Sequence, residues 1–290
     1  MNLAKLPKRL FRDEVELSLI GFGGIVVTDA EQDQANRVVA KAIEKGVNYF
    51  DVAPSYGDAQ QKLGPALKPY RDDCFLACKT TERTAEGAKR EFEESLEILQ
   101  TDHFDLYQLH SILDVDDDVE ACFARDGAMR FLIQAKREGR IRYLGFSAHS
   151  SEAALAAMGS YDFDSVLFPL NFCSAHRAGF GPRILEEART RGMARLALKG
   201  MARQKWPEEA SEADKDPWKK CWYEPLTDPA EAELALRWTL SQPITAAIPP
   251  GVEDLFWMAV DIALRFEPIT DEEEKRIEEM SHGLEPVFPV

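Results

Sequence analysis

Four side chains with complementary chemistry follow short apolar runs of the chain. Asp51 comes directly after VNYF, and Tyr56 lies just beyond it. Lys79 follows CFLAC, and His110 follows LYQL. In a barrel of parallel strands the active site forms at the carboxyl ends of the strands, so side chains at successive strand ends lie close together. Each residue alone has more ordinary uses in caps, turns and surfaces, but their shared placement predicts one site.

The chemistry that these residues could perform is proton transfer to or from an oxygen. A tyrosine phenol is a poor acid or base near neutral pH, because its unperturbed pKa is about 10. A lysine ammonium about 4 Å away would favour the phenolate by up to about 4 kcal/mol at an effective dielectric near 20, which would lower the phenol pKa by about three. Asp51 would hold and partly neutralise Lys79, and His110 would orient a substrate oxygen. The arrangement predicts protonation of an oxygen on which negative charge develops.

The elements that must position these residues are short apolar runs that alternate with longer amphipathic segments. The runs are rich in Val, Ile, Leu, Phe and Tyr, which is typical of buried parallel strands. The segments between them show helical spacing, as in QANRVVAKAIEKG, which Thr28 or Asp29 would cap and Gly46 would end. The predicted strands lie near residues 20, 50, 77, 107, 145, 168, 198 and 248.

Eight strand–helix units in succession predict a (β/α)8 TIM barrel that forms one domain over residues 1–290. A doubly wound open sheet is the alternative, but GFGG at residues 21–24 lacks the third spaced glycine of a GxGxxG fingerprint. A C-terminal extra helix, TDEEEKRIEEMS, would begin with a capping box from Thr270 to Glu273.

One long polar segment, residues 202–227, interrupts the alternation after the seventh strand. Long loops in compact domains are usually functional or mobile. This loop would either cover a cofactor and shape a substrate pocket, together with the C-terminal tail GLEPVFPV, or form a peripheral insertion.

The net charge of −16 argues against nucleic acid and membrane partners, because an acidic surface repels phosphate backbones and anionic lipid. The five cysteines are scattered and form no CxxC pair, which argues against zinc and iron–sulfur sites. We expect reduced thiols and a cytoplasmic location. The N-terminal segment does not resemble a secretory signal, and no apolar run of about 18 residues predicts a membrane span.

Three of the motifs carry a family resemblance. DVAPSYG, LACKT and LYQLH resemble the core motifs of the aldo-keto reductases, and the resemblance extends from LIGFGG to IPPG, without an iron–sulfur extension. It implies a (β/α)8 barrel with an Asp–Tyr–Lys–His tetrad, usually NADPH, and no metal. Tyr56 would be the general acid that protonates an aldehyde or ketone, with hydride from the nicotinamide. Lys79 and Asp51 would tune Tyr56, and His110 would orient the carbonyl.

The resemblance also implies a set of cofactor-binding residues at the strand ends, with departures from the family pattern. Ala148 replaces an Asn that commonly holds the nicotinamide amide, and Leu167 or a neighbour replaces a Gln. The seventh strand ends in LALKGMAR, where Lys199 is gained and an aromatic side chain is lost. The expected cofactor residues are Gly23, Gly24, Ser147, His149, Asn171, Lys199, Gly200, Met201, Arg203 and Gly251.

The resemblance favours NADP(H), with NAD(H) as the alternative. After IPPG no Lys or Arg appears before Arg265, so that segment offers a 2′-phosphate no compensating charge. Lys199, Arg203 or Lys205 would have to supply it from the strand-seven side.

Two further classes of function compete with an active reductase of small carbonyl compounds. The altered cofactor contacts are compatible with a nucleotide-binding regulatory barrel that turns over little. A metal-dependent barrel enzyme is disfavoured, because no cluster of carboxylates and histidines follows the strands.

Overall fold

The computed structural model describes residues 5–288, so the ends of the predicted domain, 1–4 and 289–290, lie outside the described residues. Its eight-stranded sheet is parallel throughout, and each strand pairs with the next along the chain. A parallel bridge between Ile20 and Ala247 joins the first and last strands. The predicted barrel and its eight strands are confirmed.

The barrel strands occupy the predicted apolar runs. They are β3 (Phe22–Gly23), β4 (Tyr49–Asp51), β5 (Phe75–Thr80), β6 (Phe104–Ile112), β7 (Ile141–Ala148), β8 (Ser165–Pro169), β9 (Ala194–Leu198) and β12 (Ala246–Ile248).

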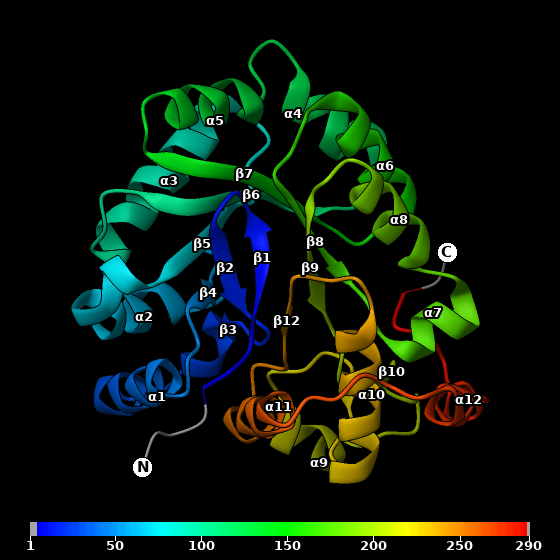
Figure 1. Ribbon diagram of the computed structural model, residues 1–290. Helices are drawn as coiled ribbons and strands as arrows, with labels where there is room; N and C mark the ends of the chain where they lie inside the picture. Colours follow the sequence, from blue (N-terminus) through cyan, green and yellow to red (C-terminus); the bar gives the residue numbers. More distant parts are fainter. Residues whose placement is uncertain (1–4, 289–290) are drawn as a thin grey trace.

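Helices surround the strands as an outer ring (Figure 1). The longer ones are α1 (Gln32–Glu44), α2 (Ala59–Leu67), α3 (Ala85–Leu99), α5 (Ala128–Arg137), α6 (Ser151–Ser160), α8 (Pro182–Thr190), α10 (Pro229–Ser241), α11 (Glu253–Leu264) and α12 (Asp271–Met280). Shorter turns are the 3-10 helices η1 (Gly24–Val27), η2 (Lys68–Asp73) and η4 (Asp216–Trp218), the π-helix η3 (Val115–Glu120), and α4 (Ala121–Phe123), α7 (Phe172–Ala178) and α9 (Glu212–Lys215).

Two of the three helix ends that the sequence predicted are found in the structure. Thr270 and Glu273 form the predicted capping box of α12. Gly46 has a φ of 92°, in the left-handed region that a glycine after a helix adopts readily. The predicted cap of α1 at Thr28 or Asp29 is wrong, because the helix begins after Glu31. Thr28 instead donates from Oγ1 to the carbonyl of Tyr56 at 3.3 Å, which ties the first loop to the candidate site.

An N-terminal hairpin that the sequence did not predict closes one end of the barrel. Its strands, β1 (Lys8–Arg12) and β2 (Val15–Ser18), pair antiparallel. Phe11 and Leu17 enter the barrel interior and pack with Tyr49 and Leu106. Arg9 donates to the carbonyl oxygens of Ile244 and Leu240 at 2.9 and 2.7 Å. The hairpin therefore fills the end of the barrel away from the strand termini that carry the candidate residues.

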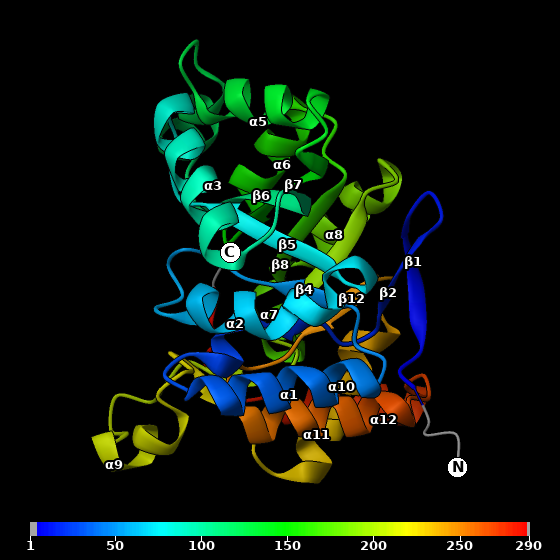
Figure 2. The same cartoon turned by 90° about the vertical axis from the view of Figure 1, so that its left-hand side faces the viewer.

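The segment at 202–227 has secondary structure of its own. Its ends pair as β10 (Ala202–Gln204) and β11 (Glu224–Pro225), and α9 and η4 lie between them. Figure 2 shows α9 at the opposite end of the barrel from β1 and β2. This segment, the strand-seven loop, therefore stands at the carboxyl ends of the strands, where it can reach the site.

We expect the hairpin to contribute to stability through Phe11. This side chain is 4% exposed, and its ring centroid lies 5.0 Å from that of Phe75 and 5.2 Å from that of Tyr143. Phe11→Ala should lower the free energy of unfolding by about 3–5 kcal/mol, measured by denaturant titration. Leu10→Ala on the same strand is the control: Leu10 is 60% exposed, so its truncation should cost at most about 0.5 kcal/mol. Similar losses for both variants would contradict the role of the hairpin as a plug.

Candidate active site

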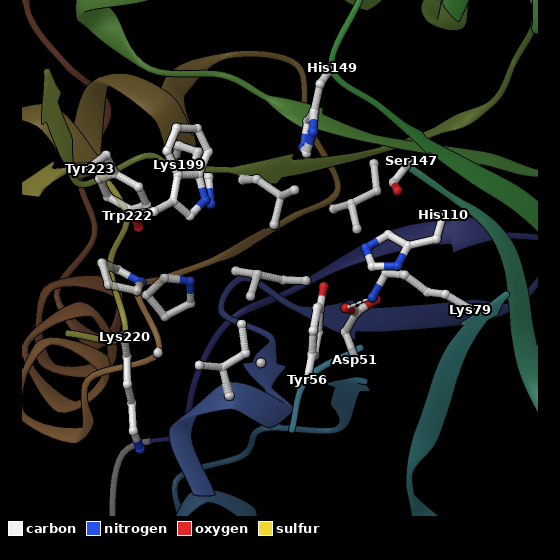
Figure 3. Close-up of a pocket in the computed structure, with 18 residues that line it drawn as sticks. Asp51, Tyr56, Lys79, His110, Ser147, His149, Lys199, Lys220, Trp222 and Tyr223 are labelled. Atoms are coloured by element: carbon white, nitrogen blue, oxygen red, sulfur yellow. Dashed lines mark hydrogen bonds and ion pairs between the residues drawn. The ribbon is translucent and has the colours of Figure 1, made fainter. Parts of the chain in front are cut away.

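A cavity opens at the carboxyl ends of the strands and collects all four residues that the sequence singled out: Asp51, Tyr56, Lys79 and His110 (Figure 3). The empty space inside it, counted with its open mouth, is about 940 Å³. Ile248 and Leu167 contribute apolar wall, and Lys220, Trp222 and Tyr223 reach in from the strand-seven loop.

Asp51 ends β4 and is buried at 2% exposure. Its carboxylate accepts from Lys79 Nζ, from Tyr49 Oη at 3.2 Å and from Gln108 Nε2 at 3.0 Å. Tyr49 and Gln108 escaped the sequence reasoning. The sequence spacing could have indicated them, because side chains two residues apart on a strand point the same way. Tyr49 lies two residues before Asp51, and Gln108 lies two residues before His110. Three donors thus hold a carboxylate that burial would otherwise penalise.

Lys79 is fully buried, and its ammonium contacts Asp51 and lies 3.4 Å from the carbonyl oxygen of Val52. Burial alone lowers the pKa of Lys79, but attraction to Asp51 and Tyr56 outweighs burial, so the pKa is raised. Lys79 therefore stays protonated. Its Nζ lies 5.0 Å from the centroid of the Tyr56 ring.

Tyr56 presents its hydroxyl to the cavity between Asp51 and the open centre (Figure 3). Burial raises the pKa of the Tyr56 phenol, Lys79 lowers it, and Asp51 raises it again, so that the net shift is upward. Lys79 acts in the expected direction, but the expected net lowering is corrected, because desolvation outweighs the effect of Lys79 and Asp51 opposes it. At neutral pH the side chain is a phenol and can donate a proton.

His110 stands beside the Tyr56 ring, with centroids 5.7 Å apart and an interplanar angle of 81°. Its Nδ1 lies 3.4 Å from Ser55 Oγ. Burial, and then the positive charges around it, lower the pKa of His110 to about 3, so the imidazole is neutral near pH 7. Arg83 fixes the backbone here: it donates to the His110 carbonyl at 2.8 Å and pairs with Asp118 at 2.8 Å.

Half of the expected cofactor residues line this cavity. Ser147 Oγ accepts from the backbone N–H of Ser111 at 2.7 Å, which leaves its own hydroxyl hydrogen for another partner. Gly251 has no room for a side chain, since a Cβ there would come 2.3 Å from Ile25. The lining members of the set are Gly23, Ser147, His149, Lys199 and Gly251.

The other half, Gly24, Asn171, Gly200, Met201 and Arg203, is not brought to the cavity wall. Arg203 pairs with Glu231 at 2.7 Å, and Asn171 caps α7 by accepting from the Ser174 N–H at 2.9 Å. Met201 is buried in the hydrophobic core, Gly200 packs against Thr239, and Gly24 packs against Val52.

Two lysines of the strand-seven side do reach the cavity. Lys199 has a φ of 66°, and its Nζ lies 4.6 Å from the ring centroid of Tyr223 and 5.1 Å from that of Trp222. Lys220 donates to the carbonyl of Val26 at 3.0 Å and so joins the strand-seven loop to η1. Lys220 and the two aromatic residues were not singled out from the sequence, although the loop itself was.

Within residues 5–288 no three His, Cys, Asp or Glu side chains gather as a metal site would require. In the same residues no helix is both long and apolar enough to cross a membrane.

Comparisons with known proteins agree on one family. The model of the Aldo/keto reductase family matches residues 19–216. The uncharacterized oxidoreductase YqkF of Bacillus subtilis (strain 168) is 27% identical over 97% of this chain and 97% of its own length. L-galactose dehydrogenase of Arabidopsis thaliana is 30% identical, but over 46% of this chain and 45% of its own. The holo form of aldo-keto reductase AKR11C1 from Bacillus halodurans superposes with a TM-score of 0.74 at 23% identity, over 97% of this chain and 98% of the other, and so shares the fold.

Both cavity imidazoles should remain neutral down to pH 5. The pKa of His110 is lowered to about 3 and that of His149 to about 4, mainly by burial. Long-range ¹H–¹⁵N NMR spectra at pH 8 and pH 5 should show unchanged nitrogen shifts for both rings, with His110→Gln and His149→Gln used to assign the signals. A titration step near pH 6.5, the value of an exposed imidazole, would contradict the neutral state.

Proposed function

The chain belongs to the aldo/keto reductase family, an oxidoreductase family that uses nicotinamide cofactors, and from this premise we propose that it reduces an aldehyde or ketone to an alcohol. The observation that carries the proposal is the protonated Tyr56 between Lys79 and His110 in one cavity. The substrate is a small carbonyl compound, and the nicotinamide supplies the hydride when it is bound.

Tyr56 is the proposed general acid. As hydride reaches the carbonyl carbon, charge develops on the oxygen, and the phenol donates its proton there. The phenolate left behind is stabilised by Lys79, which Asp51 holds in place. The neutral imidazole of His110 donates a hydrogen bond to the same oxygen and orients it. A positioned acid of this kind commonly contributes about 10²–10⁴ in rate.

The residues present fit a dinucleotide. The backbone at Gly251 leads into α11, whose N-cap, Val252, makes no side-chain cap bond, so the first backbone N–H groups remain available for a phosphate. Ser147 and His149 offer side-chain donors for an amide where Ala148 and Leu167 offer none. We therefore propose that Gly23, Ser147 and Gly251 hold the cofactor.

NADP(H) remains the proposed cofactor on family grounds, with NAD(H) as the alternative. Of the cations expected to read a 2′-phosphate, Arg203 pairs with Glu231, and Lys205 pairs with Glu285 at 2.8 Å. Lys220 is the cation at the Gly251 side of the cavity, and we propose it as the phosphate ligand.

We also propose that the reaction takes place in the cytoplasm. All five cysteines are buried as free thiols, which suits a reducing compartment.

Tyr56→Phe tests the central proposal. Removing the hydroxyl removes the proton donor, so carbonyl reduction should fall by about 10²–10⁴ while cofactor affinity is retained. Turnover is followed by the loss of reduced-nicotinamide absorbance with a panel of aldehydes and ketones, and affinity is followed by cofactor fluorescence. Cofactor binding by the natural protein without turnover across the panel would favour the regulatory barrel instead.

Lys79→Met supplies the companion pH measurement. Lys79 is the group that lowers the pKa of Tyr56, so its loss should raise that pKa further. Alcohol oxidation needs the phenolate and rises with pH through this pKa; its pH profile should therefore move to higher pH. Reduction near neutral pH should also fall, because the phenolate product loses its stabilising charge. A pH profile of alcohol oxidation that does not move would contradict the proposal that Lys79 lowers the pKa of Tyr56.

Lys220→Met should raise the Kd for NADPH about tenfold or more, since a hydrogen bond to a charged group contributes about 1.5–3 kcal/mol. The loss for NADH should be smaller if Lys220 contacts the 2′-phosphate. Lys219→Met is the matched control, because Lys219 is the next residue in the chain, and its side chain is exposed and lies outside this cavity. Equal Kd changes in the two variants would contradict the assignment.

A further inference from the structure

One strand of the barrel carries an extra residue beside the candidate active site. Leu109 on β6 pairs with Phe146 on β7, and the next pair joins Ile112 to Ala148. Strand β6 therefore advances by three residues where β7 advances by two, which defines a β-bulge at residues 110–111. A bulge interrupts the ladder of hydrogen bonds and leaves backbone groups without their strand partners. The imidazole of His110 leaves the strand at this interruption.

Ser111 holds the bulge in a strained backbone conformation. Its φ is 56°, in the left-handed region that residues other than glycine rarely adopt. Such a conformation persists only where the surrounding contacts enforce it. Ser111 directly follows His110, so a relaxation of its backbone would turn the imidazole away from Tyr56, beside which it stands (Figure 3). The contacts that enforce the bulge therefore also position His110.

Arg83 binds the carbonyl oxygens of the bulge. Its Nη2 donates to the carbonyl oxygen of His110 at 2.8 Å and lies 3.4 Å from that of Ser111. From the neighbouring strand β7, Ser147 Oγ accepts from the Ser111 N–H at 2.7 Å. One guanidinium can serve several acceptors, because its five N–H groups lie in a fixed plane. Arg83 does not line the cavity, so it acts on the site through the backbone of the bulge.

Asp118 fixes the direction of the guanidinium. Its Oδ1 accepts from Arg83 Nε at 2.8 Å. Its Oδ2 accepts from the backbone N–H groups of Leu113 and Asp114 at 2.7 and 2.9 Å. The two side chains of the pair are 19% and 16% exposed, and partly buried pairs are screened by salt much less than exposed ones. The carboxylate therefore joins Arg83 to the loop that follows β6.

The backbone of Arg83 is itself fixed. Its carbonyl oxygen accepts from the Ala128 N–H at 2.8 Å, and its Nη1 donates to the carbonyl oxygen of Thr81 at 3.2 Å. Arg83 lies four residues after Lys79, just beyond the end of β5. The guanidinium therefore ties the strand end that carries Lys79 to the strand end that carries His110.

We propose that Arg83, oriented by Asp118, is a positioning residue for carbonyl reduction: it enforces the bulge of β6 and so keeps the imidazole of His110 where it donates to the substrate oxygen. The proposal rests on the proposed function, in which His110 orients the carbonyl that Tyr56 protonates. Arg83 itself takes no part in proton or hydride transfer. Its loss lets the bulge relax, and a displacement of about 1 Å at a catalytic site can cost about 100-fold in rate.

The kinetic test uses Arg83→Ala, with Arg90→Ala as the matched control. Arg90 is an arginine of α3 that is 60% exposed and pairs with Glu82 at 3.0 Å. Arg83→Ala should lower kcat for aldehyde reduction about 10- to 100-fold and leave the Kd for NADPH within about twofold, because only the orientation of the carbonyl is lost. Rates are referred to the number of cofactor-binding sites, so that unfolded protein is not counted. Arg90→Ala should keep the natural kcat.

The conservative variant Arg83→Lys should retain part of the rate. An ammonium can bind one carbonyl oxygen, but it lacks the planar fork that also holds Asp118. An unchanged kcat in Arg83→Ala, an equal loss in Arg90→Ala, or a loss in Arg83→Lys as large as that in Arg83→Ala would overturn the proposal.

A double variant tests whether Asp118 acts through Arg83. Asp118→Asn keeps an oxygen for the backbone N–H groups of Leu113 and Asp114 but removes the charge that holds the guanidinium, so kcat should fall less than in Arg83→Ala. Residues that act as one unit give losses that do not add. Arg83→Ala with Asp118→Asn should therefore lose no more kcat than Arg83→Ala alone. Losses that add would contradict the orienting role of Asp118.

A spectroscopic measurement separates this proposal from the proposed function. The rings of His110 and Tyr56 meet edge to face, with centroids 5.7 Å apart, so nuclear Overhauser effects between their ring protons report the position of the imidazole without any turnover. These effects should weaken in Arg83→Ala and persist in Arg90→Ala, with His110→Gln used for assignment. This result supports the positioning role even if no carbonyl compound is reduced. Undiminished effects in folded Arg83→Ala refute it even if the natural protein reduces aldehydes.

Discussion

The buried ion pair between Lys79 and Asp51 is the constraint on which the site depends. Two charges at the rim of a barrel interior lose their hydration, and attraction between them offsets this cost only when the remaining lone pairs are also satisfied. Tyr49 Oη and Gln108 Nε2 supply those bonds from inward positions of β4 and β6. Because the pair spans two neighbouring strands, the barrel fixes its geometry, and the barrel in turn depends on the β1–β2 hairpin that fills its far end.

Burial and the ion pair together determine the protonation states around the pair. Asp51 offsets so much of the Lys79 charge that desolvation prevails at Tyr56, whose pKa is raised and whose resting form is the phenol. Burial lowers the pKa of His110 most, and the Lys79 ammonium lowers it further, so the imidazole is neutral. Burial next to one charged pair thus yields a neutral proton donor beside a neutral hydrogen-bond donor. This combination suits an oxygen that acquires negative charge during the reaction.

The strand-end residues were predictable because they follow from rules of local order. Alternating apolar and amphipathic segments fix the barrel, and parallel strands bring Asp51, Lys79 and His110 to one rim. The sign of the Tyr56 pKa shift was not predictable, since it depends on how far burial outweighs Lys79. The ion pair between Arg203 and Glu231 was not predictable either. Arg203 has the same charge as Lys220, but this pair occupies its guanidinium. Contacts between loop side chains and distant parts of the chain produce no periodic pattern in the sequence. The contacts of Trp222 and Tyr223 with Lys199 could not be predicted for the same reason.

Lys79 and Lys199 show how the same side chain meets two different surroundings in one cavity. A fixed carboxylate balances Lys79, so its charge acts through the neighbouring phenol and is not available to a ligand. Aromatic rings surround Lys199 instead, and they hold the ammonium without consuming its charge. A carboxylate in place of Trp222 or Tyr223 would neutralise the lysine and remove its attraction for an anion. The strand-seven loop therefore contributes rings where an acid would neutralise the lysine, and Lys199 keeps its positive charge on the cavity wall.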